Sequence, residues 1–146
     1  MRYISNVSVS IATVLKPAGL DKSKGLITGG YVIDVTDERY KDEPSFKAWK
    51  DFTSKYMSAT DFIDANAAYA FGAAATMVQV IKQCANDLSR ENVMKEAANL
   101  KNFPAPMLIP GIAVNTSPDN FSPIRQEALA SFNGESWEMF TEVLSG

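Results

Sequence analysis

The sequence contains no histidine and a single cysteine, Cys84, and both shortages exclude classes of chemistry. Without histidine, the chain can form no serine–histidine–aspartate triad, no histidine-ligated zinc site and no imidazole pH switch. One cysteine cannot form an intrachain disulfide, so cysteine usage does not identify the compartment. Cys84 lies on an apolar helical pattern, which is typical of a buried, inert thiol. These absences argue against an enzyme, and we expect neither a cofactor nor a metal.

An excess of positive charge is also missing. The 14 Lys and Arg residues are outnumbered by 17 Asp and Glu, which gives a net charge of -3. The basic residues are scattered among carboxylates, so no basic surface is available to hold a phosphate backbone. We therefore expect no nucleic-acid partner.

An acidic run between residues 34 and 43 is the one candidate for a cation site. Its carboxylates could in principle bind calcium. The interspersed Arg39 and Lys41 instead favour a solvated loop. The acidic residues of this run are Asp34, Asp37, Glu38, Asp42 and Glu43.

Long hydrophobic runs are scarce as well. The first residues show no basic segment, apolar core or cleavage site of a secretory signal, so the chain as written is expected to stay in the cytoplasm. The longest candidate for a membrane span, residues 65–81, contains seven alanines together with Asn66, Thr76 and Gln79. It is short for a span, which takes about 20 apolar residues. We interpret it as a buried helix.

What is present is typical of a single globular domain: 146 residues, of which 46% are hydrophobic. Residues 3–9 predict a short strand, and residues 11–15 predict a helical turn that ends at Pro17 and Gly19. Residues 25–33 predict a second strand, interrupted at Gly29 and Gly30. Paired glycines within a strand indicate a bend, a bulge or a close approach, as expected where a chain crosses between two bodies.

Three helices are predicted in the middle of the chain. The first begins near Pro44, because carboxylates precede it and proline suits an early helical position. Asp64 is expected to cap a helix over residues 65–84, and Ser89 a third helix. An aromatic stripe on the first helix is expected to pack on a sheet. The stripe consists of Phe46, Trp49, Phe52 and Tyr56.

The last part of the chain predicts β-structure. Residues 109–114 predict a strand and residues 116–119 a turn. Asn133-Gly134, between the apolar runs 128–130 and 137–140, predicts a hairpin with a two-residue loop. The alternation of strands and helices therefore favours an α/β layer structure with antiparallel strands at the end.

Seven short motifs stand in a characteristic order and spacing. They are Ser5-Asn-Val-Ser8, Lys16-Pro-Ala-Gly19, Lys24-Gly-Leu-Ile-Thr28, Arg90-Glu-Asn-Val-Met94, Pro110-Gly-Ile112, Asn115-Thr-Ser-Pro118 and Phe132-Asn-Gly-Glu135. Each motif alone is weak, but together they cover essentially the whole chain. The combination resembles the substrate-binding proteins of branched-chain amino acid-type ABC transporters, also called extracellular ligand-binding receptors.

The resemblance implies part of a type I periplasmic binding protein fold, a three-layer α/β architecture with a C-terminal β-hairpin. It is confined to the carboxyl-terminal part of the family, which implies a truncated form. By analogy, residues 1–30 belong to the second lobe, 31–122 to the first, and 123–146 return to the second. The implied hinge positions are Gly29, Gly30, Tyr31 and Pro123.

The resemblance also implies a solute-binding component of an importer in the periplasm, with an ABC permease as partner. The ligand is a small amino acid-like or aromatic or aliphatic carboxylate held between the lobes. Because the turn at residues 5–8 offers no carboxylate for an amino group, acids without an amine are favoured. The implied ligand-binding residues are Asn6, Ser8, Asn66 and Tyr69.

Two further expectations follow from a partial fold. The chain alone is expected to bind family ligands weakly, because groups from the missing half hold the ligand carboxylate. It is also expected to form a homo-oligomer, by exchanging residues 1–30 and 123–146 between copies. The alternative function is a ligand-sensing regulatory module of the same fold.

Overall fold

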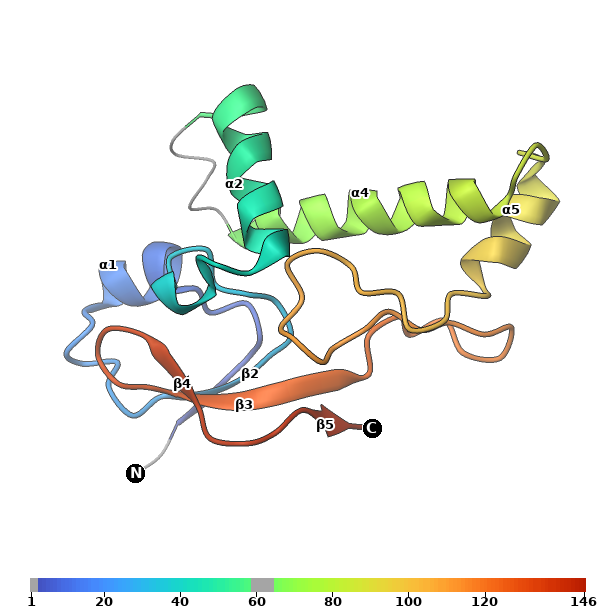
Figure 1. The fold of residues 1–146 in the computed structure, drawn as a ribbon. Helices are drawn as coiled ribbons and strands as arrows, with labels where there is room; N and C mark the ends of the chain where they lie inside the picture. Colours follow the sequence, from blue (N-terminus) through green and yellow to red (C-terminus); the bar gives the residue numbers. More distant parts are fainter. Residues whose placement is uncertain (1–2, 59–64) are drawn as a thin grey trace.

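The structure is a computed structural model that describes residues 3–58 and 65–146, and it places the helices above one open sheet (Figure 1). Two short helical turns, at Ile11–Leu15 and Glu38–Tyr40, accompany the named elements. The named elements are β1 (Ile4–Ser5), α1 (Lys16–Ala18), β2 (Ile27–Gly30), α2 (Pro44–Tyr56), α4 (Ala65–Gln83), α5 (Arg90–Ala97), β3 (Gln126–Phe132), β4 (Trp137–Met139) and β5 (Leu144–Ser145).

The sheet is built from the two ends of the described chain. Its order is β1-β2-β3-β4, and β5 pairs with the start of β3. β1 runs parallel to β2, whereas the β2–β3 and β3–β4 pairs are antiparallel. The mixed α/β class predicted from the sequence is thus confirmed. The end segments pair with each other in the sheet, and their exchange between copies stays a prediction.

Both N-terminal strands are shorter than predicted. Only Ile4–Ser5 and Ile27–Gly30 are strands. The paired glycines do not interrupt β2, because Gly29 and Gly30 lie in register with Leu129 and Ala128. The close approach expected at the pair is found at Gly29, where a Cβ would lie 2.5 Å from a carboxylate oxygen of Glu127.

The predicted C-terminal hairpin is present, but its loop consists of the four residues 133–136 and not of the two residues predicted. Phe132 pairs with Trp137, and their rings meet edge to face with centroids 5.4 Å apart. Gly134 adopts a φ of 113°, a conformation that glycine tolerates best. The Asn133 side chain accepts hydrogen bonds from the backbone N–H groups of Glu135 and Ser136, at 2.8 and 2.9 Å. The Asn133 side chain and the backbone conformation of Gly134 therefore stabilise the turn locally.

The helices begin largely where the sequence predicted. Pro44 is the first residue of α2, and the Ser89 side chain accepts from the N–H of Asn92 at the start of α5. The expected cap at Asp64 lies outside the described residues. The aromatic stripe does not pack on a sheet: Phe46 and Trp49 are buried against loops and α4, while Phe52 and Tyr56 are exposed.

The interpretation of residues 65–81 as a buried helix is wrong. Along α4 only Ala68 and Val80 are buried, and its other side chains are half-buried or exposed. Within residues 3–58 and 65–146, none of the helices combines the length and apolarity that crossing a membrane requires.

The strand predicted at residues 109–114 is also wrong. This segment makes isolated pairings, Val32 with Leu108 and Phe103 with Val114, instead of a ladder. Pro110 has no N–H to donate, and Gly111 takes a φ of 93°, so extended pairing cannot continue. The apolar residues of the segment serve the core as a packed loop.

Gly72 generates a prediction about how α4 is held. A Cβ at this position would lie 2.8 Å from the carbonyl oxygen of Pro106. Alanine gains about 1 kcal/mol of helix propensity over glycine, but the clash forces the backbones apart. We expect Gly72→Ala to lower the free energy of unfolding by about 1–2 kcal/mol, measured by urea denaturation. The exposed Ala74→Ser control should change it by less than about 0.5 kcal/mol. A more stable Gly72→Ala protein would contradict the close packing.

Candidate functional site

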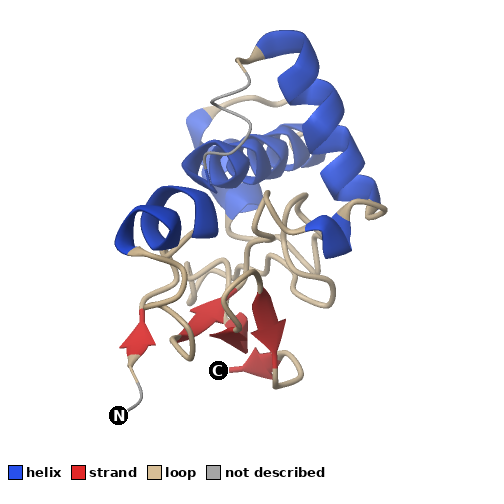
Figure 2. Cartoon of the chain, turned by 90° about the vertical axis from the view of Figure 1, so that its left-hand side faces the viewer, coloured by secondary structure: helices blue, strands red, loops and turns tan. Residues whose placement is uncertain are grey.

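The candidate site is a cleft of about 310 Å³ between the sheet and the helical part of the molecule. Figure 2 shows the strands on one side and α2 and α4 on the other, with loops between them. The volume falls at the lower end of the range of small-molecule sites. Five separate parts of the chain line it: residues 7–13, residues 28–40, the start of α4, Ile109, and the β3–β4 hairpin.

The first wall is the turn after β1. The Asn6 side-chain oxygen accepts the N–H of Ser8 at 2.9 Å, and the Asn6 carbonyl accepts the Thr28 hydroxyl at 2.9 Å. Ser10 then caps the next turn by accepting the N–H of Thr13 at 3.2 Å. Asn6 thus holds the turn in shape from outside the cleft, whereas Ser8 and Ser10 line it.

The crossing out of β2 forms the floor. Gly29, Gly30 and Tyr31 all line the cleft, and Asn66 and Tyr69 face it from the first turns of α4. Burial raises the pKa of Tyr31, and the neighbouring Tyr69 raises it further. Tyr31 therefore stays protonated and keeps an O–H donor at physiological pH.

Asp34 ties the crossing to the turn on the first wall. Its carboxylate accepts the N–H of Ile11 at 3.1 Å, the N–H of Thr36 at 2.9 Å and the hydroxyl of Thr36 at 2.7 Å. An ionised carboxylate offers about four acceptor sites, so three of them are occupied. Asp34 is a fixed part of the cleft wall and not part of a solvated loop.

Asp37 and Arg39 join the same loop to the hairpin. Asp37 is buried, and Arg39 binds it through Nε at 2.9 and 3.0 Å and through a second nitrogen at 2.5 Å. The same guanidinium donates to the backbone carbonyl of Trp137 on β4. The hydrogen bond to Asp37 raises the pKa of Arg39, which stays charged. The Tyr40 hydroxyl lies 3.8 Å from the sulfur of Met139, and burial raises the pKa of Tyr40.

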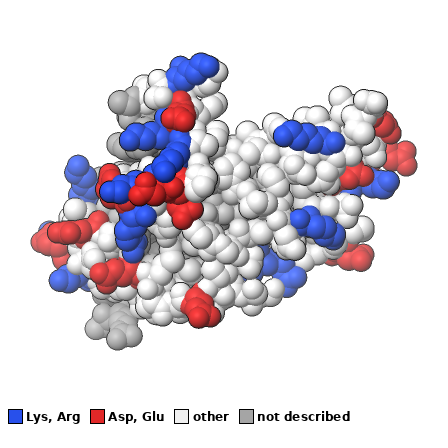
Figure 3. Space-filling model, in the orientation of Figure 1, with Lys and Arg blue, Asp and Glu red and all other residues white. Residues whose placement is uncertain are grey.

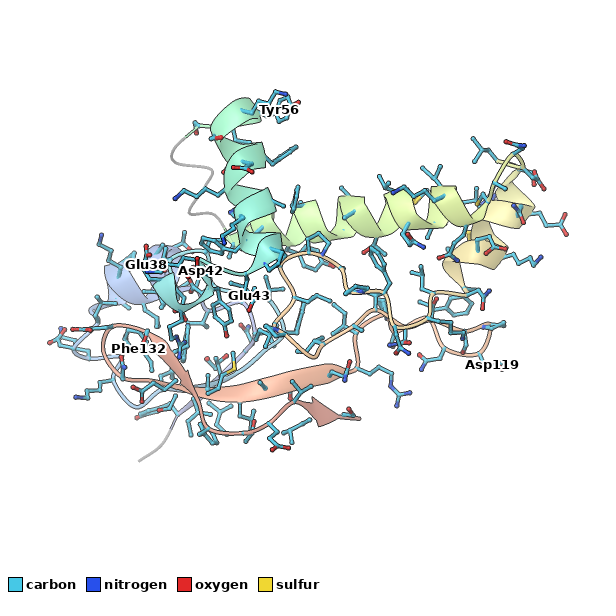
Figure 4. The ribbon with its side chains drawn as sticks, viewed as in Figure 1. Glu38, Asp42, Glu43, Tyr56, Asp119 and Phe132 are labelled. Atoms are coloured by element: carbon cyan, nitrogen blue, oxygen red, sulfur yellow. The ribbon has the colours of Figure 1, made fainter. Side chains whose placement is uncertain are left out.

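The acidic run therefore divides into two parts, and its interpretation as a solvated loop is wrong for its first half. Asp34 and Asp37 line the cleft, whereas the exposed Glu38 and Asp42 and the half-buried Glu43 continue toward α2, as labelled in Figure 4. Figure 3 shows basic and acidic atoms gathered around the foot of α2. Within the described residues, no group of acidic or cysteine side chains could hold a metal ion.

The predicted site residues are only partly brought together. Ser8, Asn66 and Tyr69 line the cleft with the three crossing residues 29–31. Asn6 does not line it, and Pro123 lies instead beside a second cavity of about 180 Å³ under α4. That these residues bind a ligand or act as a hinge stays a prediction.

Sequence reasoning missed a second group of lining residues. Asp34 and Asp37 were assigned to a solvated loop, although the acidic run was the signal that could have found them. The hairpin was predicted without its role in the cleft. The missed residues are Ser10, Thr28, Asp34, Asp37, Arg39, Tyr40 and Trp137.

Comparison with known proteins identifies the architecture. No family model and no curated protein matches the sequence. Among solved structures, the chain is similar to the crystal structure of a branched chain amino acid ABC transporter from Thermus thermophilus with bound valine, with a TM-score of 0.83. The chain has the fold of part of that protein.

The match covers 100% of this chain and 40% of the Thermus chain, at 15% sequence identity. The chain thus spans well under half the length of its structural neighbour. The resemblance inferred from the seven motifs is confirmed at the level of the fold.

The Asp37–Arg39 pair yields a prediction about the cleft wall. Arg39→Gln leaves the buried Asp37 without its cation and removes a donor to Trp137. We expect a loss of about 1–3 kcal/mol in unfolding free energy, since Arg39 is partly exposed to screening solvent. Asp37→Asn combined with Arg39→Gln should cost less than the two single changes added together, as a double-mutant cycle would measure. The adjacent exposed Lys41→Gln is the control, and strict additivity would contradict the pairing.

Proposed function

We propose that the chain is part of a solute-binding component of an ABC-type importer, and that the cleft holds a small carboxylate. The observation that supports this best is the convergence of hydroxyl, amide and aromatic side chains from distant segments on one cleft. The fold is shared with a protein crystallised with bound valine. In this role the protein works in the periplasm and presents its solute to a membrane permease.

The proposed division into lobes follows the elements. Every strand of the described sheet comes from residues 4–30 or 126–145, and α2, α4 and α5 come from residues 44–97. We assign residues 1–30 and 123–146 to one lobe and 31–122 to the other. Gly29, Gly30 and Tyr31 then lie where the chain passes between them, and closure over a solute would turn about such positions.

The chemistry of the cleft favours a small acid with an apolar or aromatic body. Tyr31 and Tyr69 supply ring faces and hydroxyl donors, and Ser8 supplies another hydroxyl. The start of α4 directs its positive end to the same side, which favours a carboxylate. Of the two carboxylates that line the cleft, Asp34 already accepts three hydrogen bonds and Asp37 is bound by Arg39. An amino group on the ligand therefore gains little.

Titration followed by amide NMR tests the proposed cleft. The chain accounts for 40% of the length of its structural neighbour, so we propose that these residues alone bind weaker than micromolar. Aliphatic and aromatic acids should shift the amides of Ser8, Gly29, Gly30 and Tyr69. Tyr69→Phe, which removes one hydroxyl, should weaken binding by roughly two- to tenfold. Tyr3→Phe, at an exposed tyrosine outside the cleft, should not.

Shifts confined to other surfaces, or micromolar binding that Tyr69→Phe leaves unchanged, would contradict the cleft as the site. Circular dichroism of each variant separates lost binding from lost folding.

Matched ligand pairs test the ligand class. Valine and isovalerate share a branched apolar body and a carboxylate, and they differ in the α-amino group. Because Asp34 has about one acceptor site left, we expect isovalerate to bind at least as tightly as valine. Phenylalanine and hydrocinnamate form the aromatic pair for the same titration. A preference of more than about tenfold for both amino acids would show that the cleft pairs with an amine.

A further inference from the structure

The loop of the β3–β4 hairpin contains the single Asn-Gly pair of the sequence, Asn133-Gly134. Figure 4 labels Phe132, the last residue of β3, which stands directly before this loop. In an Asn-Gly pair the backbone nitrogen of the glycine can attack the carbon of the asparagine side-chain amide, because glycine has no Cβ to obstruct the approach. The pair that shapes the turn is therefore also open to a covalent change.

The attacking group in this reaction is the backbone nitrogen of Gly134. Among the described residues its N–H donates to no acceptor, whereas the N–H groups of the other three loop residues are all hydrogen-bonded. A Cβ placed at Gly134 would meet a carbon of the Lys24 side chain only at 4.0 Å. Solvent base can therefore reach the Gly134 proton.

The group under attack, the side-chain carbonyl of Asn133, is already polarised. Its Oδ1 accepts the N–H of Glu135 at 2.8 Å and the N–H of Ser136 at 2.9 Å. Negative charge develops on this oxygen when a nucleophile adds to Cγ, and two backbone N–H donors stabilise that charge as an oxyanion hole does. The Nδ2 group, which leaves, donates to Oε1 of Glu138 at 2.7 Å. Nucleophile, activated carbonyl and leaving group thus lie together in one loop.

We propose that Asn133 is a site of spontaneous deamidation in the folded chain and that its conversion weakens the hairpin. Solvent base takes the Gly134 proton, the nitrogen bonds to Cγ, and the bond from Cγ to Nδ2 breaks as ammonia leaves with a proton from water. Water then opens the cyclic imide. Its attack at Cγ gives aspartate, and its attack at the α-carbonyl carbon gives isoaspartate. The net reaction consumes water, releases ammonia and involves no oxidant or reductant.

The conversion removes a hydrogen-bond donor and adds a negative charge. Aspartate at position 133 can still accept the two loop N–H groups, but it cannot donate to Glu138. Two carboxylates then stand where an amide and a carboxylate are now 2.7 Å apart, and like charges at such a separation repel.

Isoaspartate has a further effect, because it lengthens the backbone by an extra atom next to the pairing of Phe132 with Trp137. The carbonyl of Trp137 also accepts from Arg39 in the cleft wall. A weakened hairpin therefore loosens that wall as well.

Peptide mapping by mass spectrometry, on the complete folded chain incubated at mildly alkaline pH, tests the site. Asn6 and Asn120 are matched controls within the same molecule, since each side-chain oxygen accepts the N–H two residues further on. They are followed by Val7 and Phe121, whose side chains obstruct the attack. We expect Asn133 to be converted at least about tenfold faster than either control. Equal rates, or conversion of Asn133 in urea but not in the folded chain, would overturn the proposal.

Urea unfolding of variants tests the effect on the hairpin. Asn133→Asp reproduces the aspartate product and should lower the midpoint of unfolding. Adding Glu138→Gln removes the facing charge and should restore most of the loss. Asn6→Asp is the control, because it makes the same change at a side chain that contacts no carboxylate within the described part of the chain, and it should shift the midpoint much less. An unchanged midpoint in Asn133→Asp, or a loss that Glu138→Gln does not reduce, would contradict the weakened hairpin.

Discussion

The structure depends on the short extended passage from Gly30 to Ile33, because this passage is bonded on both sides of the cleft. At its start, Gly30 pairs with Ala128 in the sheet. Beyond it, the Tyr31 carbonyl accepts the N–H of Ile109 at 2.9 Å, and the N–H of Ile33 donates to the Met107 carbonyl at 2.8 Å. A backbone held on both sides fixes where the sheet ends and the helical part begins. The cleft is the space that this passage leaves between them.

Residues 34–39, which follow this passage, make a second set of bonds between the sheet and the helical part. The carboxylate of Asp34 accepts the N–H of Ile11, in the segment after the edge strand β1. Arg39 donates to the carbonyl of Trp137 on β4, at the opposite edge of the sheet. Both are charge-assisted hydrogen bonds to backbone groups, which are stronger than neutral ones. These hydrogen bonds fix the distance between segments that lie far apart in the sequence. Polar side chains at the cleft therefore have two tasks, and those that brace its walls have little capacity left for a ligand.

The sequence predicted the elements whose causes are local. The hairpin follows from Asn133 and Gly134, and the starts of α2 and α5 follow from Pro44 and Ser89. The same local reasoning failed at residues 109–114, where apolar composition predicted a strand but no partner strand continues the pairing begun at Leu108. It also failed at residues 34–37, because an acidic run is interpreted as solvated unless two distant partners are known: the N–H of Ile11, which donates to Asp34, and the carbonyl of Trp137, which accepts from Arg39. Side-chain contacts in the cleft wall join groups as far as 99 residues apart, and no local pattern contains that distance.

The exposure of α4 has the same non-local origin. Its composition, rich in alanine with scattered Met77 and Val78, correctly indicated a helix that tolerates close packing, yet close packing requires a surface to pack against. Within the described residues, that surface covers one side of the helix at Ala68, Gly72 and Val80. Burial is thus a property of the neighbours as much as of the helix, and a pattern that predicts a buried helix predicts only that it can be covered. The apolar side chains left exposed on its remaining sides, such as Met77 and Val78, are therefore surface whose burial would be favourable.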